Sequence, residues 1–123
     1  LRTLRAFERS ERAPLLLCLN DGPADGRDVS WIWDVDLEQV AATGNDCSCA
    51  GTRWADMCNR LHYAGVPSER LHGLGVDPLP ALDRFVRTVP PGGNGYVLAT
   101  YSAMLRLRRE LARRDDLVEF WEQ

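Results

Sequence analysis

The sequence contains no lysine, only two histidines and only four cysteines, and each shortage excludes a class of site. All fifteen basic residues are arginine, so the chain lacks the lysine that P-loop nucleotide hydrolases need to hold phosphates. His62 and His72 are in an expected helix end and a weak strand, where neither is placed to activate a thiol. We interpret both histidines as structural or solvated, and the sequence predicts no nucleophilic catalytic site.

The cysteines do not have the spacing of a zinc ribbon. Cys47 and Cys49 form a single C-x-C pair, whereas a ribbon needs two C-x-x-C pairs, so no metal site is predicted. Cys18 and Cys58 lie in a strand pattern and a helix pattern, and we interpret them as small buried hydrophobic residues. A reduced, cytoplasmic protein is the simplest interpretation. A disulfide from Cys47 or Cys49 to a neighbour stays open.

Long apolar runs and a large net charge are also missing. No segment approaches the roughly 20 apolar residues of a membrane span. The formal net charge of -3 gives no support for binding to nucleic acid or to an anionic membrane. A length of 123 residues with 45% hydrophobic residues predicts a single domain over 1–123. Because the chain has no initiator methionine and begins inside an expected helix, we expect a fragment of a longer protein.

Apolar segments of strand and helix length alternate along the chain. Thr52 is predicted to be the N-cap of the second helix, and Asp77-Pro78 is predicted to begin the third. Short connections between alternating strands and helices predict an α/β fold, a doubly wound and mostly parallel sheet with helices on both faces. The expected strands are 15–19, 46–50, 71–76 and 96–100, and the expected helices are 2–12, 53–63, 80–86 and 102–114.

The loop after the first strand is the first place to look for function, because ligands of such folds bind at the carboxyl ends of strands. Crowded carboxylates raise each other's pKa or hold cations, although aspartates in loops often only make turns. The segment 28–36 is ambiguous between a strand and a helical turn. If it is extended, Trp31 and Trp33 lie on one side of it. The loop and this segment hold five aspartates: Asp21, Asp25, Asp28, Asp34 and Asp36.

Three segments resemble the C-terminal domain of the MurT family. The stretch NDGPADGRDVSWIWDVD resembles, over its full length, the most characteristic part of that domain. CAGTRWADMCNRLHYAGV resembles the helix segment that follows, and GYVLATYSAMLRLRRELARR resembles the last strand and helix. The resemblance covers about residues 13–123. It implies the third, Rossmann-like domain of a relative of the Mur ligases, which closes over a central ATP-binding domain.

The resemblance also implies a reaction for the whole enzyme. MurT works with GatD, a glutaminase that releases ammonia from glutamine. The ligase is expected to activate the α-carboxyl of glutamate in lipid II as an acyl phosphate, which ammonia converts to isoglutamine. ATP and Mg²⁺ would be held mainly by the central domain, and so would a zinc ribbon in many members. We therefore expect the isolated C-terminal domain to retain no cofactor and to be inactive.

The resemblance suggests roles for particular residues. In Mur ligases the loop after an early strand of the third domain carries an aspartate that positions the incoming amine, and Asn20 and Asp21 stand where this loop begins. A MurT aspartate is expected beside the glutaminase site. Our candidates for this catalytic role are Asp28 and Asp34, with Asp21 third. Trp31 and Trp33 are predicted to support the loop or to face GatD.

Two other interpretations stay open. The domain could be a non-catalytic interaction module that docks an amidotransferase partner, with structural aspartates. It could also be a free-standing domain of flavodoxin shape that binds a small ligand, although no phosphate- or flavin-binding loop is evident. Changes of aspartate to asparagine within residues 21–34 separate the first two interpretations, since only catalytic residues would abolish amidation while the complex stays intact.

Overall fold

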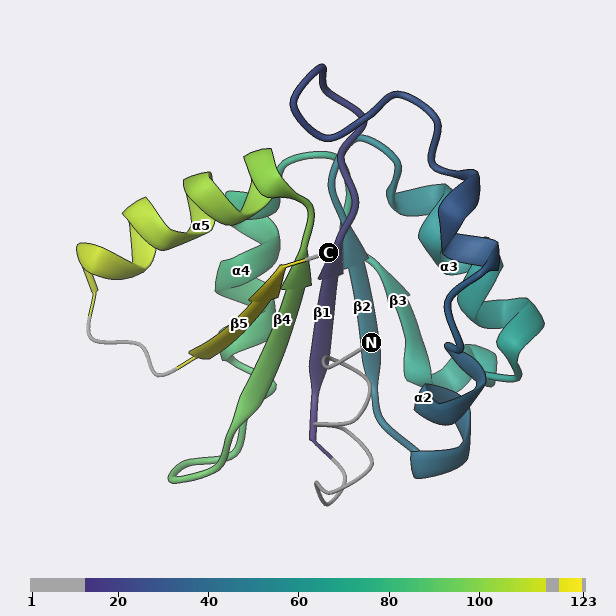
Figure 1. Cartoon of the computed structure of the whole chain (residues 1–123). Coiled ribbons are helices and arrows are strands. Elements are labelled where there is room, and N and C mark those ends of the chain that lie inside the picture. The colour runs from purple at the N-terminus through teal and green to yellow at the C-terminus, as the bar shows by residue number, and fades with distance from the viewer. Residues whose placement is uncertain (1–12, 115–117, 123) are drawn as a thin grey trace.

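The alternating pattern folds into a single five-stranded sheet in the computed structural model, which describes residues 13–114 and the backbone of 118–122 (Figure 1). The strand order is β3-β2-β1-β4-β5, and every neighbouring pair is parallel. The predicted fold class is confirmed. The strands are β1 (Leu15–Cys18), β2 (Cys47–Ala50), β3 (Leu71–Gly73), β4 (Gly95–Ala99) and β5 (Val118–Glu122). The helices are η1 (Ser30–Trp33), α2 (Glu38–Thr43), α3 (Trp54–Ala64), η2 (Ser68–Arg70), α4 (Pro78–Val86) and α5 (Tyr101–Ala112).

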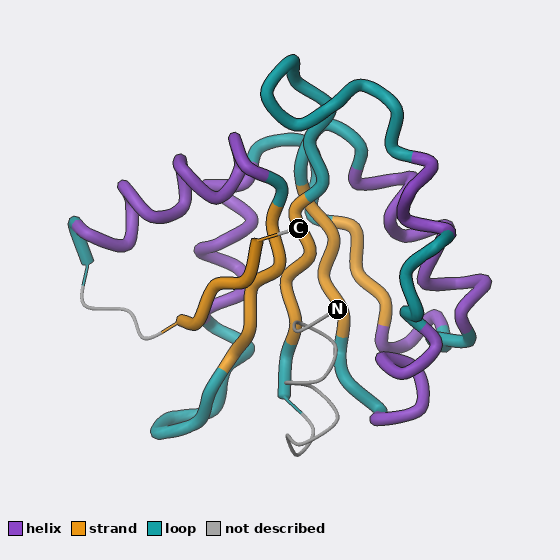
Figure 2. The backbone as a smooth tube through the Cα atoms, in the orientation of Figure 1, coloured by secondary structure: helices purple, strands orange, loops and turns teal. Residues whose placement is uncertain are grey.

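Helices cover both faces of the sheet, because successive side chains of the buried strands point to opposite sides. Leu15 and Leu17 of β1 pack with η1, α2 and α3 on one face. Leu16 and Cys18 pack with α4 and α5 on the other face. Figures 1 and 2 show the two helical layers on opposite sides of the strands. This two-sided burial explains why β1 is a continuous apolar run and β2 consists of small residues, with no polar–apolar alternation of the solvent-facing kind.

The strand order changes direction between β1 and β4. From β1 the chain passes to β2 and β3 on one side, and then returns to β4 and β5 on the other. The loops that leave the carboxyl ends of β1 and β4 therefore diverge, and a crevice forms between them in folds of this kind. The long loop after β1 arches over this edge of the sheet (Figure 1).

Several elements differ from the predictions. Helix α2 and strand β5 were not predicted, and β3 is shorter than the predicted strand 71–76. The predicted helix over 2–12 lies outside the described residues. The predicted start of α4 is confirmed, since the Asp77 carboxylate accepts a hydrogen bond from the Leu79 amide at 3.0 Å. No helix in the described part of the chain is long and apolar enough to cross a membrane.

The cysteines are free thiols. Cys18 is buried as predicted, and burial raises the pKa of Cys18 and of Cys47 to about 12. Cys58 is only half-buried, which corrects the prediction for that residue. The pKa of Cys58 is lowered because it accepts a hydrogen bond from the Cys49 thiol. Cys47 and Cys49 lie in the core beneath α3 and act as hydrophobic residues, and Cys58 of α3 packs against this core.

Candidate functional site

Asn20 joins the three loops that meet at the carboxyl edge of the sheet. Its backbone amide donates to the Thr100 hydroxyl at 2.9 Å, and its side-chain amide donates to the Ser102 hydroxyl at 3.0 Å. Its side-chain oxygen accepts from the Thr52 amide at 2.9 Å. Asn20 thus connects the end of β1 to the loop before α3 and to the start of α5. Both polar groups of this side chain have protein partners, so its evident role is to fix the loops.

Gly51 allows the loops to come this close. It has a φ of +101°, and a Cβ at this position would collide with the Leu19 carbonyl and lie 2.7 Å from the Asn20 side-chain oxygen. Only glycine adopts this backbone conformation without strain and leaves the needed space. The backbone approach at Gly51 is therefore a condition for the hydrogen bonds of Asn20.

Asp21 is paired rather than free. One carboxylate oxygen accepts from the Thr52 hydroxyl at 3.0 Å, and the other accepts from the Arg53 guanidinium at 3.2 Å. The Thr52 and Arg53 hydrogen bonds lower the pKa of Asp21, which stays ionised at neutral pH. Arg53 also binds Asp56 at 2.7 Å. The predicted N-cap role of Thr52 is wrong, because the N-cap of α3 is Arg53 and the Thr52 hydroxyl serves Asp21 instead.

Asp25 caps helix α5 from a distant part of the chain. Its carboxylate accepts from the Ser102 backbone amide at 2.7 Å and from the Ser102 hydroxyl at 2.5 Å. Thr100, at the N-cap position of α5, makes no side-chain cap bond. Sequence reasoning counted Asp25 among the five aspartates and offered it only a turn-making role. The only signal for this role was a helix start after β4 that lacks an acidic residue in its first turn.

Asp28 and Asp34 lie on either side of η1, and both are exposed. The Asp28 carboxylate accepts from the Ser30 amide at 2.9 Å, and this bond, together with the Ser30 hydroxyl, lowers the pKa of Asp28. Asp34 is the residue after η1, and its backbone amide donates to the Trp31 carbonyl at 3.0 Å. Within the described residues the Asp34 carboxylate makes no hydrogen bond or ion pair. Both carboxylates are therefore available to a partner or a substrate.

The five aspartates are not gathered into one acidic cluster. Asp21, Asp25 and Asp28 each have the separate local partners given above, and the Asp36 carboxylate accepts from the Gln39 side chain at 2.9 Å. In the part of the chain that the structure describes, no group of three or more His, Cys, Asp or Glu residues could hold a metal ion. The expected crowding of carboxylates is wrong, because four of the aspartates each bond to a donor of their own and the fifth, Asp34, is exposed.

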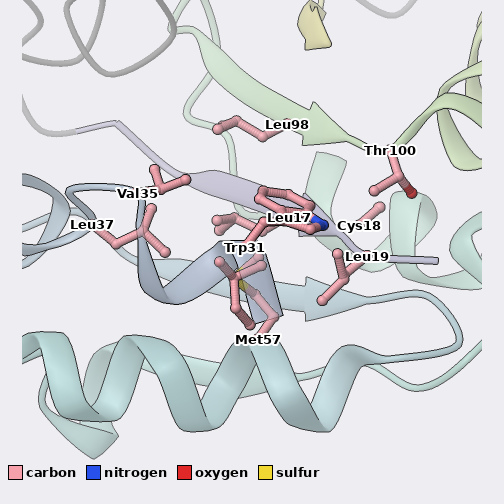
Figure 3. A pocket seen from close by; sticks show the side chains of 10 residues that line it. Leu17, Cys18, Leu19, Trp31, Val35, Leu37, Met57, Leu98 and Thr100 are labelled. Carbon is pink, nitrogen blue, oxygen red and sulfur yellow. The ribbon is translucent and has the colours of Figure 1, made fainter. Parts of the chain in front are cut away.

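Trp31 and Trp33 point in different directions, because the segment takes the helical-turn alternative and the one-sided arrangement expected of an extended strand does not arise. The segment 30–33 is a 3₁₀ helix rather than an extended strand. Trp31 packs against the core and lines an apolar space of about 20 Å³, with Leu17 and Met57 close to it (Figure 3). Trp33 is 49% exposed and lies 5.9 Å from the ring of Tyr63, which is 68% exposed. Trp31 thus supports the loop, and Trp33 presents an indole to the surface.

An open cleft lies at the switch point beside this loop. It has a volume of about 310 Å³ and is lined by Ala24, Asp25, Trp31, Thr100 and Tyr101. Its residues come from the loop after β1, from η1 and from the start of α5. The position agrees with the general rule for parallel α/β sheets. Of the predicted site residues, Trp31 lines this cleft, whereas Trp33 and Asp34 lie on the exposed turn at the end of η1.

Arg60 is the residue of this region that sequence reasoning missed. It is a buried cation of α3, only 3% exposed, and it binds the segment that follows the first loop. Its guanidinium carbon lies 5.2 Å from the centre of the Trp33 ring. The available signal was its spacing. Arg60 lies three residues after Met57 and next to Leu61, on the predicted packed face of the helix.

Comparison with known proteins agrees with this geometry. The family described as MurT ligase C-terminal matches residues 1–104. The chain is also 34% identical, over 117 residues, to the lipid II isoglutaminyl synthase (glutamine-hydrolyzing) subunit MurT of Streptococcus pneumoniae. That match covers 89% of this chain and 25% of the relative, so the chain spans about a quarter of the relative's length. On these matches, the chain belongs to the MurT ligase C-terminal family.

Proposed function

We propose that this chain is the C-terminal domain of a cytoplasmic ligase subunit that works with a GatD-type glutaminase. The complete enzyme would amidate the α-carboxyl of glutamate in lipid II, with ATP as the energy source, and give isoglutamine. The observation that carries the proposal is the segment 28–34, whose exposed residues Asp28, Trp33 and Asp34 present two carboxylates and an indole within a chain of this family. The relative from Streptococcus pneumoniae bears the name of this reaction.

The proposed chemistry needs a carboxylate where ammonia arrives. An ionised carboxylate binds ammonium, accepts a proton from it, or orients a histidine of the glutaminase. The lowered pKa of Asp28 keeps that carboxylate ionised, and Asp34 is exposed without a protein partner in the described residues. When ammonia attacks the activated carbonyl carbon, a C–N bond forms, the C–O bond to phosphate breaks, and the nitrogen loses a proton. Asp28 or Asp34 would act on the nitrogen before or during this step.

The nucleotide is proposed to bind outside this domain. In parallel α/β folds, phosphates bind at helix N-termini at the carboxyl edge of the sheet. Here the Asp25 carboxylate occupies the N-terminus of α5, and its negative charge opposes a phosphate at the same place. The chain also has no lysine to offer. These residues do not fit a nucleotide phosphate, so we assign ATP and Mg²⁺ to the central domain of the larger protein.

Asn20 and Asp21 have a modest part in this proposal. Both side chains are held by protein partners, Asn20 by Ser102 and Thr52, and Asp21 by Thr52 and Arg53. We propose that they shape the edge of the substrate site and that Asp28 and Asp34 are the stronger catalytic candidates.

A docking role is supported by Trp33 and Tyr63, because two exposed aromatic rings in contact are typical of the centre of a protein interface.

Asparagine substitutions in the complete protein test the proposal. Asp28→Asn and Asp34→Asn each remove a charge but keep the shape of the side chain. At least one of them is expected to block amidation while the melting temperature and the complex with the glutaminase stay unchanged. Asp36→Asn is the matched control, since Asp36 is exposed and its carboxylate accepts a hydrogen bond from the Gln39 side chain. Full amidation by both test variants would show that the catalytic assignment is wrong.

A further inference from the structure

Arg60 is a buried charge that needs several partners. A guanidinium removed from water is costly unless its donors are satisfied. Its Nε donates to the Ile32 carbonyl at 2.8 Å, and one Nη donates to the Val35 carbonyl at 2.7 Å. The guanidinium also pairs with both carboxylate oxygens of Glu38, at 3.0 and 3.3 Å. One side chain of α3 thus holds four acceptor atoms.

All of these acceptors belong to one short stretch, residues 32–38. The two bonded carbonyls are those of Ile32 and Val35, and the residues between them are Trp33 and Asp34. Arg60 is therefore hydrogen-bonded to the backbone on both sides of the exposed turn, residues 33–34. Its ion pair with Glu38 adds a contact to α2, and the Arg60 hydrogen bonds lower the pKa of the Glu38 carboxyl.

The Trp33 side chain of the same turn contacts the Arg60 guanidinium. The guanidinium carbon is 5.2 Å from the centre of the Trp33 ring, within the range of a cation–π contact. Tyr63, one helical turn after Arg60, also lies beside that indole, at 5.9 Å between ring centres. The orientation of Trp33 and the path of the backbone at Asp34 are thus both set from α3.

We infer that Arg60 is a positioning residue that holds the Trp33–Asp34 turn in the orientation needed to couple the ligase to its glutaminase partner. The inference rests on the proposed function and adds a residue to it. Arg60 itself is covered by this turn and does not touch substrate. Its planar group reaches two carbonyls and a carboxylate at once, which the single ammonium of a lysine does not reproduce. The charge alone is therefore not sufficient.

The test uses the full-length protein with its glutaminase and two nitrogen sources. Amidation is measured with glutamine, which needs the partner, and with free ammonia, which does not. Arg60→Lys is expected to lower the glutamine-dependent rate about 10-fold to 100-fold, because small misplacements at a site have effects of this size. The ammonia-dependent rate is expected to stay within about twofold. Arg106→Lys is the matched control, because Arg106 lies on α5 and makes an exposed ion pair with Asp77.

Each outcome separates coupling from simple stability. A parallel loss of both rates would mean that Arg60 supports the fold or the Asp34 carboxylate rather than the coupling to the glutaminase, and unchanged rates would mean that it has no role; either result overturns the inference. If the unsubstituted protein amidates with neither nitrogen source, the proposed function itself is overturned. If Arg60→Lys does not fold, Glu38→Gln replaces it, with an expected fall of about threefold in the ratio of the two rates. An unchanged ratio in that variant would contradict the inference.

Discussion

The carboxylate of Asp25 and the first turn of α5 are joined by two hydrogen bonds to Ser102, from its backbone amide at 2.7 Å and its hydroxyl at 2.5 Å. Asp25 belongs to the loop after β1, and Ser102 follows β4. This contact connects the two loops at the edge of the sheet where the strand order changes direction. It also places a fixed negative charge at the helix end where related folds receive anions.

Loss of this cap is expected to destabilise the domain. Asp25→Ala removes a long-range cap and should lower the free energy of unfolding by about 1–2 kcal/mol, the usual cost of an N-cap deletion. Asp25→Asn keeps an oxygen acceptor and should cost less than the alanine change. Urea denaturation of the two variants measures the difference. Equal stability of Asp25→Ala and the unchanged protein would show that the cap contributes little.

Gly51 is expected to be the least replaceable glycine among those at positive φ. Gly51→Ala combines backbone strain with a collision against the Leu19 carbonyl, so it should cost more than about 2 kcal/mol. Gly26→Ala is the matched control, since Gly26 has a φ of +92° but no atom within 4 Å of an added Cβ. The control should cost about 1 kcal/mol, from strain alone. Equal destabilisation in thermal melts would mean that the close approach at Gly51 relaxes freely.

Asp21 should make stability depend on acid pH. The pKa of this carboxyl is lowered in the folded protein by Thr52 and Arg53, so its contribution is complete above the unfolded pKa of about 3.9. The contribution is lost as the pH falls through the lower folded pKa. Asp21→Asn should therefore melt at a lower temperature than the unchanged protein at neutral pH, and the two should converge in acid. Parallel melting curves across the acid range would contradict the assigned ion pair.

The two tryptophans should separate stability from binding. Trp31 packs on the core, so Trp31→Ala should lower the free energy of unfolding by about 2–4 kcal/mol. Trp33 is 49% exposed, so Trp33→Ala should change stability little but weaken binding to the glutaminase at least about 10-fold. Chemical denaturation and calorimetric titration measure the two effects. Full affinity of Trp33→Ala would move the partner contact away from this turn.

The strands at the centre of the fold could be predicted from their amino-acid composition. β1 and β2 are buried on both faces, so every residue of these strands must be small or apolar, and their runs stand out in the sequence. Helix α2 has only six residues and β5 pairs at the sheet edge, so neither has a strong periodic signal of its own. Helix α2 ends at Gly44, in the left-handed conformation, and this was the one local cue to its existence.

The polar site was less predictable, for a physical reason. Each aspartate of the loop has several possible donors, and its actual donor is set by the tertiary fold. Asp25 is hydrogen-bonded to Ser102, 77 residues away in the sequence, and Arg60 is hydrogen-bonded to Ile32, 28 residues away. The choice of a 3₁₀ turn over a strand at 30–33 then decided the directions of Trp31 and Trp33. Local sequence patterns carry no information on partners at such separations.

The most direct test of the central claim is an amidation assay with the full-length protein that contains this domain. The protein is mixed with its cognate glutaminase, ATP, Mg²⁺, glutamine and lipid II, and the stem peptide is analysed by mass spectrometry. Conversion of the glutamate α-carboxyl to the amide, lost when ATP or glutamine is left out, is the expected result. An unchanged stem peptide under conditions where both subunits are folded and bound to each other would contradict the account.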